Sequence, residues 1–402
     1  MPVLIVGASV AGIRTAQALR RGGHDDMITV VGEETHHPYD RPPLSKEMLG
    51  GDGDGTPVPL LTAEELGKLS LELRLGVRAA GLDPHAAVVC TAAGEELSYD
   101  GGGLVIATGL VPRMLPYGTL RGVHTIRTAD DALAVRAALA RTPRVVVVGA
   151  GFIGAELASA AREYGCRVTI VEAQPVPMAQ LLGEAVGEQF ADLHGAHGVR
   201  LHAGTGVAGL ESAGGAVTGV ALDNGQVLAA DLVIVGIGAR PATDWLASSG
   251  LPVSDGIECD ERLRVVGFPR IHAAGDVARW PHHRYGEPLR IEHWTNANEH
   301  GAIVAADILG LPAPAVQVPY VWSDQYGHRT QIAGRPATGR LVALAGTAVG
   351  GDLVALYAGD DGGLVGGVVV DDTRTFMKVR RAIVARAPAR SLGLPLRGPA
   401  RG

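Results

Sequence analysis

Residues 2–33 constrain the fold most, because they combine a short apolar strand, a glycine-rich turn, an alanine-rich helix and a second strand that leads to an acid. The first strand is expected at Val3–Val6, and the turn runs from Gly7 to Gly12. This order is typical of a βαβ unit that binds a dinucleotide, since the glycines allow a tight turn and a close helix–strand contact. Glu33 follows Gly12 by about 20 residues, where a carboxylate can accept hydrogen bonds from an adenosine ribose.

The turn itself reads GASVAG, and Ser9 stands where the usual motif has its second glycine. We expect Gly7, Ser9, Ala11 and Gly12 to lie against a pyrophosphate at the amino end of the following helix. The hydroxyl of Ser9 then either loosens the approach of the phosphates or donates a hydrogen bond to them. A glycine turn also caps ordinary helices, but the strand, helix and acid at these spacings favour a nucleotide site.

A second unit of the same kind lies further along the chain. Val145–Val148 predict a buried strand, and Gly149, Gly151 and Gly154 complete an unmodified G-x-G-x-x-G motif. Glu172 ends the next expected strand, where its carboxylate suits a ribose 2′-hydroxyl and repels a 2′-phosphate, so NADH is favoured over NADPH. The residues expected to contact NADH are Gly149, Gly151, Phe152, Ile153, Gly154, Glu172 and Gly238.

The composition limits the function classes that remain. With 402 residues and 47% hydrophobic content, the chain is long enough for two or three domains with sizeable cores. A net charge of −7 disfavours a general nucleic-acid-binding protein. The first apolar run lacks a basic leader, and the longest apolar stretch, residues 145–155, is shorter than the ~20 residues of a membrane helix. We therefore expect a cytoplasmic protein with no nucleic-acid or membrane partner.

Cysteine and histidine spacing gives no sign of a metal site or a local redox pair. Cys90, Cys166 and Cys259 lie far apart in the sequence, and each is expected to be a small core residue. His282 and His283 have no third ligand at metal spacing, so we expect both at the surface.

Other segments complete the expected organisation. Arg41 and Lys46, in a polar, proline-bearing segment, offer cations for a pyrophosphate or an anionic ring, although a solvated helix start fits the composition equally well. A helix is expected to begin near Thr295. Beyond this helix the pattern changes to short strands separated by glycines and closes with a helix expected over residues 373–386, which indicates a third, α+β domain.

Several segments, taken together, resemble the FAD-dependent NADH:ferredoxin reductases of the putidaredoxin and rhodocoxin reductase type. They are GASVAG at 7–12, RPPLSKEML at 41–49, ATGLVPR at 107–113, GAGFIGAE at 149–156, GIGARP at 236–241, AAGDVA at 273–278, EHWTNA at 292–297 and VWSDQYG at 321–327. The resemblance covers nearly the whole chain. The chain departs from this family at Ser9, and it lacks an arginine soon after Glu172.

The resemblance implies an α/β fold with two Rossmann-like dinucleotide-binding domains, of the glutathione-reductase kind, and a C-terminal α+β domain. The FAD-binding domain is expected at residues 1–112 and 237–318, the NAD-binding domain at 113–236 and the C-terminal domain at 319–402. The NADH domain is then an insertion in the FAD domain, and the C-terminal domain flanks the flavin.

The resemblance also implies roles for individual residues. It places Trp294 and Trp322 beside the flavin ring and Asp276 on the ribitol chain, and the helix after Trp294 directs its positive end at the flavin N1/C2=O edge. A Lys46–Glu156 pair, the expected catalytic residues, then lies next to the site of hydride transfer. The residues expected to contact FAD are Gly7, Ser9, Ala11, Gly12, Glu33, Arg41, Lys46, Thr108, Arg113, Asp276, Trp294, Thr295 and Trp322.

The implied activity is electron transfer from NADH through FAD to an iron–sulfur ferredoxin, because a hydride donor supplies two electrons and a ferredoxin accepts one. Residues 41–49 contain no cysteine, so the thiol route of glutathione-reductase-like relatives is closed. The ferredoxin is expected to be a transient, acidic partner that serves a haem-thiolate monooxygenase or a ring-hydroxylating dioxygenase. Two alternatives stay open: an FAD-dependent NADH oxidase or quinone reductase, and an NADH-binding flavoprotein scaffold with slow turnover.

The charge distribution indicates where that partner docks. Every charged residue after Asp372 is basic, whereas the rest of the chain is acidic overall. These basic residues are Arg374, Lys378, Arg380, Arg381, Arg386, Arg390, Arg397 and Arg401. A solvated tail explains the charges from Arg390 onward, but for residues 374–386 we expect a patch that orients an acidic ferredoxin.

Overall fold

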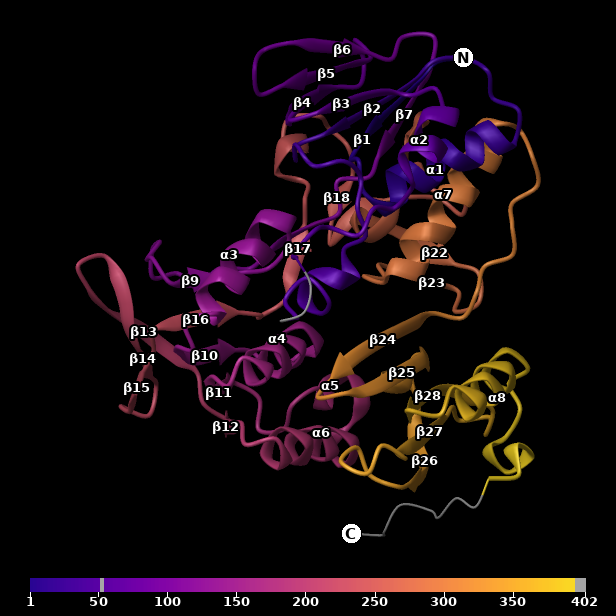
Figure 1. Cartoon of the computed structure of the whole chain (residues 1–402). Coiled ribbons are helices and arrows are strands. Elements are labelled where there is room, and N and C mark those ends of the chain that lie inside the picture. Colours follow the sequence, from indigo (N-terminus) through magenta and orange to yellow (C-terminus); the bar gives the residue numbers. More distant parts are fainter. Residues whose placement is uncertain (51–53, 395–402) are drawn as a thin grey trace. The chain divides into compact units, whose positions relative to one another are not determined.

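The computed structural model describes residues 1–50 and 54–394, and the chain divides into two compact units (Figure 1). The first unit gathers residues 1–41, 57–111 and 239–317, and the second gathers residues 42–56, 112–238 and the chain from Val318 onward. Arg397 and Arg401 of the basic tail lie outside the described residues. Within the described ranges, the helices lack either the length or the apolar character needed to span a bilayer.

The first unit is built on a six-stranded sheet in the order β20-β21-β7-β1-β2-β3. The strands from β21 to β3 pair in parallel, and β20 joins the edge in antiparallel orientation. The bounds are Val3–Val6 (β1), Ile28–Gly32 (β2), Glu72–Leu75 (β3), Gly103–Ile106 (β7), Arg264–Val265 (β20) and Phe268–Ala273 (β21). β1 and β7 are buried along their whole length, as expected of central strands in a sheet that is covered on both faces.

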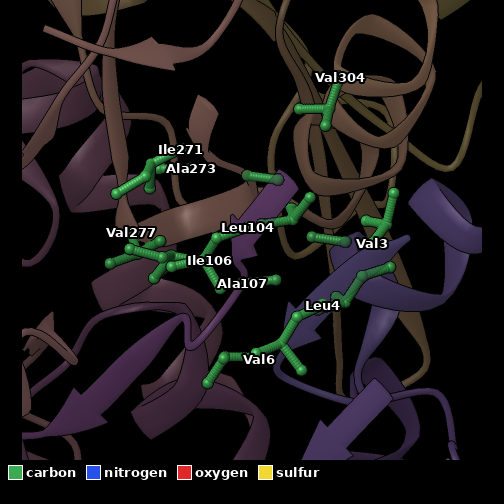
Figure 2. Close-up of a cluster of buried hydrophobic side chains, with 14 of the residues drawn as sticks. Val3, Leu4, Val6, Leu104, Ile106, Ala107, Ile271, Ala273, Val277 and Val304 are labelled. Carbon is green, nitrogen blue, oxygen red and sulfur yellow. The ribbon is translucent and has the colours of Figure 1, made fainter. Parts of the chain in front are cut away.

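Apolar side chains of the central strands form the core of this unit. Figure 2 shows side chains of β1, β7 and β21 packed together, with Val304 of α7 (Trp294–Ile308) in the same cluster. α7 packs against α1 (Val10–Arg21), and a Cβ on Gly301 would come within 2.7 Å of the Thr15 amide nitrogen. The missing side chain at Gly301 therefore lets the two helix backbones approach closely.

Smaller elements complete the first unit. β4, β5 and β6 form an antiparallel sheet, β18, β19, β22 and β23 form another, and β8 pairs with β17. The bounds are Ala63–Lys68 (α2), Ala79–Asp83 (β4), Val88–Thr91 (β5), Glu96–Ser98 (β6), Leu110–Pro112 (β8), Ala239–Pro241 (β17), Asp244–Leu246 (η2), Val253–Ser254 (β18), Gly256–Glu258 (β19), Gly275–Val277 (η3), Ala278–His282 (β22) and Glu287–Leu289 (β23).

The second unit contains a five-stranded parallel sheet in the order β12-β11-β10-β16-β9. β13, β14 and β15 form a separate antiparallel sheet between β12 and β16 in the sequence. The bounds are Pro42–Ser45 (η1), Val123–His124 (β9), Ala129–Leu139 (α3), Arg144–Val148 (β10), Phe152–Glu163 (α4), Arg167–Glu172 (β11), Ala179–Leu182 (α5), Glu184–Ala196 (α6), Arg200–Ala203 (β12), Val207–Ala213 (β13), Ala216–Leu222 (β14), Val227–Ala229 (β15) and Leu232–Val235 (β16).

The C-terminal part of the second unit is an antiparallel sheet with one helix packed on it. The strand order is β24-β25-β28-β27-β26. Phe376, Val379 and Ile383 of α8 are buried against this sheet, while Arg374, Lys378 and Arg381 on the same helix are exposed. The bounds are Tyr320–Gln325 (β24), His328–Gly334 (β25), Pro336–Thr338 (η4), Arg340–Ala345 (β26), Val354–Ala358 (β27), Leu364–Val370 (β28), Thr373–Val384 (α8) and Ala389–Leu392 (η5).

The observed elements confirm the predicted fold class, two Rossmann-like sheets and a C-terminal α+β part. The helix expected near Thr295 begins one residue earlier, at Trp294. The helix expected to reach Arg386 ends at Val384, and Arg386 has a left-handed backbone (φ +49°) that a helix does not continue through. The segment at 42–45 is a 3₁₀ helix. The three-domain division stays a prediction, because both the parallel and the antiparallel sheet belong to the second unit.

One surface expectation was wrong. His282 is 1% exposed, because it ends β22 beside the buried ring of Trp280 and packs against Tyr285, whereas His283 is exposed as expected. The short polar segment gave no periodic pattern that would have indicated this burial.

Candidate functional site

The first glycine loop connects β1 to α1 and has a geometry that requires its glycines. The Gly7 amide donates to the Val31 carbonyl at 2.8 Å, and Gly7 has a φ of +123°. A Cβ at Gly7 would lie 2.2 Å from the Ala107 carbonyl oxygen, and one at Gly12 would lie 2.0 Å from the Gly7 carbonyl oxygen. Both glycines are therefore fixed by close backbone contacts, as the motif predicts.

Ser9 is turned toward a cluster of polar side chains beside this loop. The Arg41 guanidinium donates through Nε to the Ser9 hydroxyl at 3.1 Å and through Nη2 to a Glu34 carboxylate oxygen at 2.7 Å. The Tyr39 hydroxyl donates to the other Glu34 oxygen at 2.5 Å, and the Arg41 guanidinium carbon lies 5.7 Å from the Tyr39 ring centroid. The structure thus brings Arg41 to the amino end of α1, where a cation and the helix dipole both favour an anionic group.

The two acids after β2 have different surroundings. The Glu33 side chain is 67% exposed and lies 3.5 Å from Arg78, whereas the Glu34 side chain is 24% exposed and bonded to Arg41. Glu33 was predicted from its spacing and stays a predicted ribose ligand, whereas the Glu34–Arg41 contact was not predicted. The pair of adjacent acids was the available signal, but spacing alone does not say which side chain turns inward.

The second glycine loop, between β10 and α4, repeats the backbone geometry of the first. The Gly149 amide donates to the Val171 carbonyl at 2.8 Å, and a Cβ at Gly154 would lie 2.0 Å from the Gly149 carbonyl oxygen. A Cβ at Gly151 would meet nothing within 4 Å, so this glycine leaves open space for a close ligand. The loop therefore fits a pyrophosphate of a second dinucleotide.

Glu172 is tied to this loop by both carboxylate oxygens. One oxygen accepts a hydrogen bond from the Ala150 amide at 2.8 Å, and the other accepts one from the Gln174 amide at 2.7 Å. In the first unit the equivalent position is Gly32, the last residue of β2, because the amide of Gly7, the counterpart of Gly149, donates to the Val31 carbonyl. The acid of the first unit is consequently displaced by one residue along the chain relative to Glu172.

A buried ion pair joins Lys46, the residue after η1, to Glu156 of α4 in the second unit. Lys46 Nζ lies 2.7 Å from a Glu156 carboxylate oxygen, with side-chain exposures of 12% and 2%. The Ser45 hydroxyl donates to the same oxygen, and the Ser323 hydroxyl of β24 donates to the other oxygen at 2.7 Å. Gln325 donates in turn to Ser323 at 3.1 Å.

This network fixes the orientation of the Glu156 carboxylate. Each carboxylate oxygen accepts at least one charge-assisted or hydroxyl hydrogen bond, which is what a buried charge needs. The Lys46–Glu156 pair was predicted from the resemblance, and the structure confirms that the two side chains meet. The contacts of Ser45 and Ser323 were not predicted; Ser323 is separated from Glu156 by 167 residues, and no local pattern links them.

The other expected contacts of the first unit gather around the carboxyl ends of β7 and β21. The Thr108 hydroxyl donates to the Ala242 carbonyl at 3.0 Å. Asp276 is half-buried in η3, directly after β21, and Thr295 is half-buried in the first turn of α7. The Trp294 indole donates to an Asp40 carboxylate oxygen at 2.6 Å. Ligands of open α/β sheets bind at this edge.

The remaining expected contacts belong to the second unit. The exposed Arg113 donates its amide hydrogen to the Gly238 carbonyl at 3.0 Å, so these two positions are neighbours. Phe152 is half-buried, Ile153 is 46% exposed, and the half-buried Trp322 stacks on Tyr320 with ring centroids 5.7 Å apart. Of the expected FAD contacts, Lys46, Arg113 and Trp322 are in the second unit and the others are in the first, so a flavin site assembled from both stays a prediction.

All three cysteines are free thiols. Cys166 and Cys259 are buried and Cys90 is half-buried, and burial raises the pKa of the Cys166 and Cys259 thiols. A thiol kept protonated in this way is a poor nucleophile. Among the described residues, no group of three or more potential ligands is placed to hold a metal ion.

Comparison with known protein families agrees with these two glycine loops. The pattern described as pyridine nucleotide-disulphide oxidoreductase matches residues 1–301, and the one described as reductase C-terminal matches residues 320–393. The chain belongs to the pyridine nucleotide-disulphide oxidoreductase family. Within this family it matches the ferredoxin reductases, which confirms the resemblance noted in the sequence.

Relatives in this family match along almost the whole chain. Rhodocoxin reductase of Rhodococcus erythropolis is 35% identical over 390 residues, covering 96% of this chain and 90% of the relative. The ferredoxin–NAD(+) reductase subunit of the benzene 1,2-dioxygenase system of Pseudomonas putida is 36% identical over 386 residues, covering 96% and 92%. The reductase in a covalent putidaredoxin reductase–putidaredoxin complex superposes with a TM-score of 0.93 at 30% identity, covering 98% and 96%.

Proposed function

We propose that this chain is an FAD-dependent NADH:ferredoxin reductase that supplies electrons, through a ferredoxin, to a haem-thiolate monooxygenase or a ring-hydroxylating dioxygenase. The observation that carries the proposal is the match of 96% of the chain to ferredoxin reductases of dioxygenase and related systems. The geometry supports it, because each unit has a glycine loop shaped for a dinucleotide.

The first unit is the proposed FAD domain. The amino end of α1 and Arg41 would hold the pyrophosphate, and Arg41 is already oriented by Ser9 and Glu34. Glu33 remains the proposed ribose ligand. Asp276 would take a ribitol hydroxyl.

The amino end of α7 would stabilise negative charge at the flavin edge. The side chain of Trp294, at that end, is oriented by its bond to Asp40 and would lie by the ring. FAD, when bound, supplies the chemistry that converts a two-electron hydride donor into a one-electron source.

The second unit contains the proposed NADH site. Gly151 leaves room for the pyrophosphate at the amino end of α4, and Glu172 would face the ribose 2′-hydroxyl. The Lys46–Glu156 pair is proposed to lie next to the site of hydride transfer. There Lys46 would present a fixed positive charge, since Glu156 is hydrogen-bonded on both oxygens and holds it in place.

The route by which electrons leave follows from the thiols. Residues 41–49 contain no cysteine, and the three cysteines are free and at least half-buried. Electrons would therefore pass from the flavin directly to a docked protein. A folded variant in which Cys90, Cys166 and Cys259 are replaced by Ala would keep ferredoxin reduction.

The test is NADH-driven reduction of a panel of iron–sulfur ferredoxins by the purified protein, with its FAD content measured first. We expect a yellow protein that reduces at least one ferredoxin much faster than it reduces oxygen or quinones. Fast turnover with oxygen or a quinone alone would favour the oxidase alternative, and slow turnover with every acceptor would favour the scaffold. A colourless protein that takes up no FAD would refute the proposal.

A further inference from the structure

α7 carries a wholly buried histidine, His300, that has no role in the function proposed so far. Its side chain is 0% exposed, and its Nδ1 accepts a hydrogen bond from the Gly275 amide at 3.1 Å. Gly275 opens η3, the turn that contains Asp276. His300 therefore contacts the backbone directly before the side chain that is proposed to bind ribitol.

The turn at Gly275 leaves little room for alternative backbone positions. Gly275 has a φ of +76°, which favours glycine. A Cβ there would lie 3.0 Å from the Ala11 Cβ and 3.6 Å from the Ala297 Cβ, so the turn is packed between the first turn of α1 and α7. The position of Gly275 is thus coupled to the glycine loop as well as to Asp276.

Two polar contacts hold this turn from opposite ends. His300 accepts from the Gly275 amide, and the Arg290 guanidinium donates to the Asp276 carbonyl at 3.4 Å. The Arg290 side chain is 11% exposed and is itself paired with Asp255 and Glu292. The backbone on both sides of the Asp276 side chain is therefore fixed by buried or nearly buried side chains.

The surroundings of His300 keep it a hydrogen-bond acceptor. Burial, and secondarily the charge of His282, lowers the pKa of His300 to about 3, so its imidazole stays neutral at ordinary pH. With Nδ1 accepting, the proton sits on Nε2, which has no hydrogen-bond partner in the described part of the chain. The ring meets Trp280 edge-on, with centroids 5.1 Å apart at 83°.

The sequence next to His300 explains how it reaches the turn. Gly301 lets α7 approach α1 so closely that a Cβ there would lie 2.7 Å from the Thr15 amide nitrogen. This contact fixes how α7 is rotated about its axis and how far it is shifted along that axis relative to α1. Because His300 precedes Gly301, its side chain is held facing η3.

We propose that His300 is a positioning residue for the flavin site: by accepting the Gly275 amide hydrogen it fixes η3, so that Asp276 is presented to the ribitol chain of FAD. The inference rests on the proposed function, because it requires that the first unit binds FAD. It adds a residue outside the recognised motifs, and it assigns that residue an effect on one part of the ligand.

The test compares His300→Leu with His300→Asn, because leucine and asparagine have similar size but only asparagine offers an acceptor where Nδ1 stands. FAD release from the full-length holoprotein is followed by FAD fluorescence during serial dilution, and ADP is used as a competitor in the same series. His300→Leu leaves the buried Gly275 amide without a partner, so we expect this variant to raise the FAD dissociation constant about tenfold or more. His300→Asn should stay within about threefold of the unmodified protein.

ADP separates positioning from general damage, because it lacks the ribitol chain and tests only the glycine loop. Its competition constant should change less than about twofold in His300→Leu. His194→Leu is the matched control: His194 is also 0% exposed, but it lies in α6 of the second unit and bonds to Tyr326, so FAD affinity should not change.

Three results would overturn the inference. Unchanged FAD affinity in a folded His300→Leu variant would show that the contact does not act on the flavin site. Equal losses of FAD and ADP affinity would show a merely structural role. If the leucine variant does not fold, hydrogen exchange of the Gly275 amide in the unmodified protein serves as the test. Fast exchange of this amide contradicts the proposal, and protection of this amide from exchange supports it. An unmodified protein that binds no FAD would instead refute the proposed function.

Discussion

Glu156→Gln is the substitution that most directly tests how the buried network of the second unit is held. Glutamine keeps the volume of the side chain and can still accept from Ser323, which lies 2.7 Å from one carboxylate oxygen. It cannot supply the negative charge that faces Lys46 Nζ at 2.7 Å. Among the described residues, Lys46 would then keep a weak contact to the Pro42 carbonyl at 3.4 Å, and the Lys46 side chain is 12% exposed.

The expected cost follows from these surroundings. Removing one partner of a fully buried ion pair costs ~3–5 kcal/mol. Because Lys46 retains a little contact with solvent, we expect the low end, about 3 kcal/mol in the free energy of unfolding. Lys46→Met in the Glu156→Gln background removes the orphaned charge, so the double variant should recover about 2 kcal/mol, an interaction energy typical of residues in contact. Ser323→Ala removes one hydrogen bond to a charged group and should cost ~1.5–2 kcal/mol.

Calorimetric unfolding at saturating FAD measures these differences. In a unit of about 200 residues, 1 kcal/mol shifts Tm by ~2–4 °C, so Glu156→Gln should lower the transition of the second unit by about 6–12 °C. A shift below about 2 °C, or strictly additive effects of the Lys46 and Glu156 substitutions, would refute the reasoning. Arg240→Gln is the control, because its pair with Asp244 is exposed and should contribute less than about 1 kcal/mol.

Three further predictions concern other sites. Burial lowers the pKa of His194 to about 4, so the folded protein excludes a proton that the unfolded chain takes up below about pH 6.5. This residue should therefore remove about 1.6 kcal/mol from the free energy of unfolding between pH 6.5 and pH 5, and urea unfolding of His194→Asn should show a smaller loss over the same range. NADH should be preferred over NADPH, and equal kcat/KM values for the two cofactors in the unmodified protein would contradict this prediction. Gln174→Arg should narrow the preference; Glu172 is kept in this variant because its carboxylate accepts hydrogen bonds from the Ala150 and Gln174 amides. Charge reversal at Arg380 and Arg381 should slow ferredoxin reduction at low salt and leave NADH-to-ferricyanide turnover nearly unchanged, with less effect as salt shortens the Debye length from ~10 Å at 0.1 M toward ~3 Å at 1 M. The single variant Arg381→Glu is the more specific test, because Arg381 is exposed whereas the Arg380 guanidinium lies 5.8 Å from the Tyr320 ring centroid. If ferredoxin reduction and ferricyanide turnover fall together, the patch supports folding.

The glycine loops were predictable from the sequence because each depends on local backbone geometry. Gly7 and Gly149 have positive φ, and Gly12 and Gly154 lie so close to a carbonyl oxygen that a Cβ would not fit. Only glycine meets these requirements at this fixed spacing, so the loops can be recognised in the sequence. The parallel sheets follow from the buried strands on either side of each loop.

The polar contacts were less predictable, because they depend on which of two adjacent side chains points into the protein or on partners that are far apart in the sequence. Glu33 and Glu34 differ by one position, and only the fold shows that Glu34 bonds to Arg41. The Ser323–Glu156 bond joins β24 to α4 across 167 residues, and the His300–Gly275 bond joins α7 to η3. Neither has a local periodicity or a spacing rule from which it could be read.

The order of strands in the first sheet has a consequence for synthesis on the ribosome. β7 sits between β1 and β21, so this sheet stays incomplete until the chain has been made as far as Ala273. The parallel sheet of the second unit needs only residues 123–235, all of which are translated earlier. The inserted segment can therefore finish its own sheet while β7 still exposes the edge that β21 will pair, a stage at which aggregation and chaperone binding compete with folding.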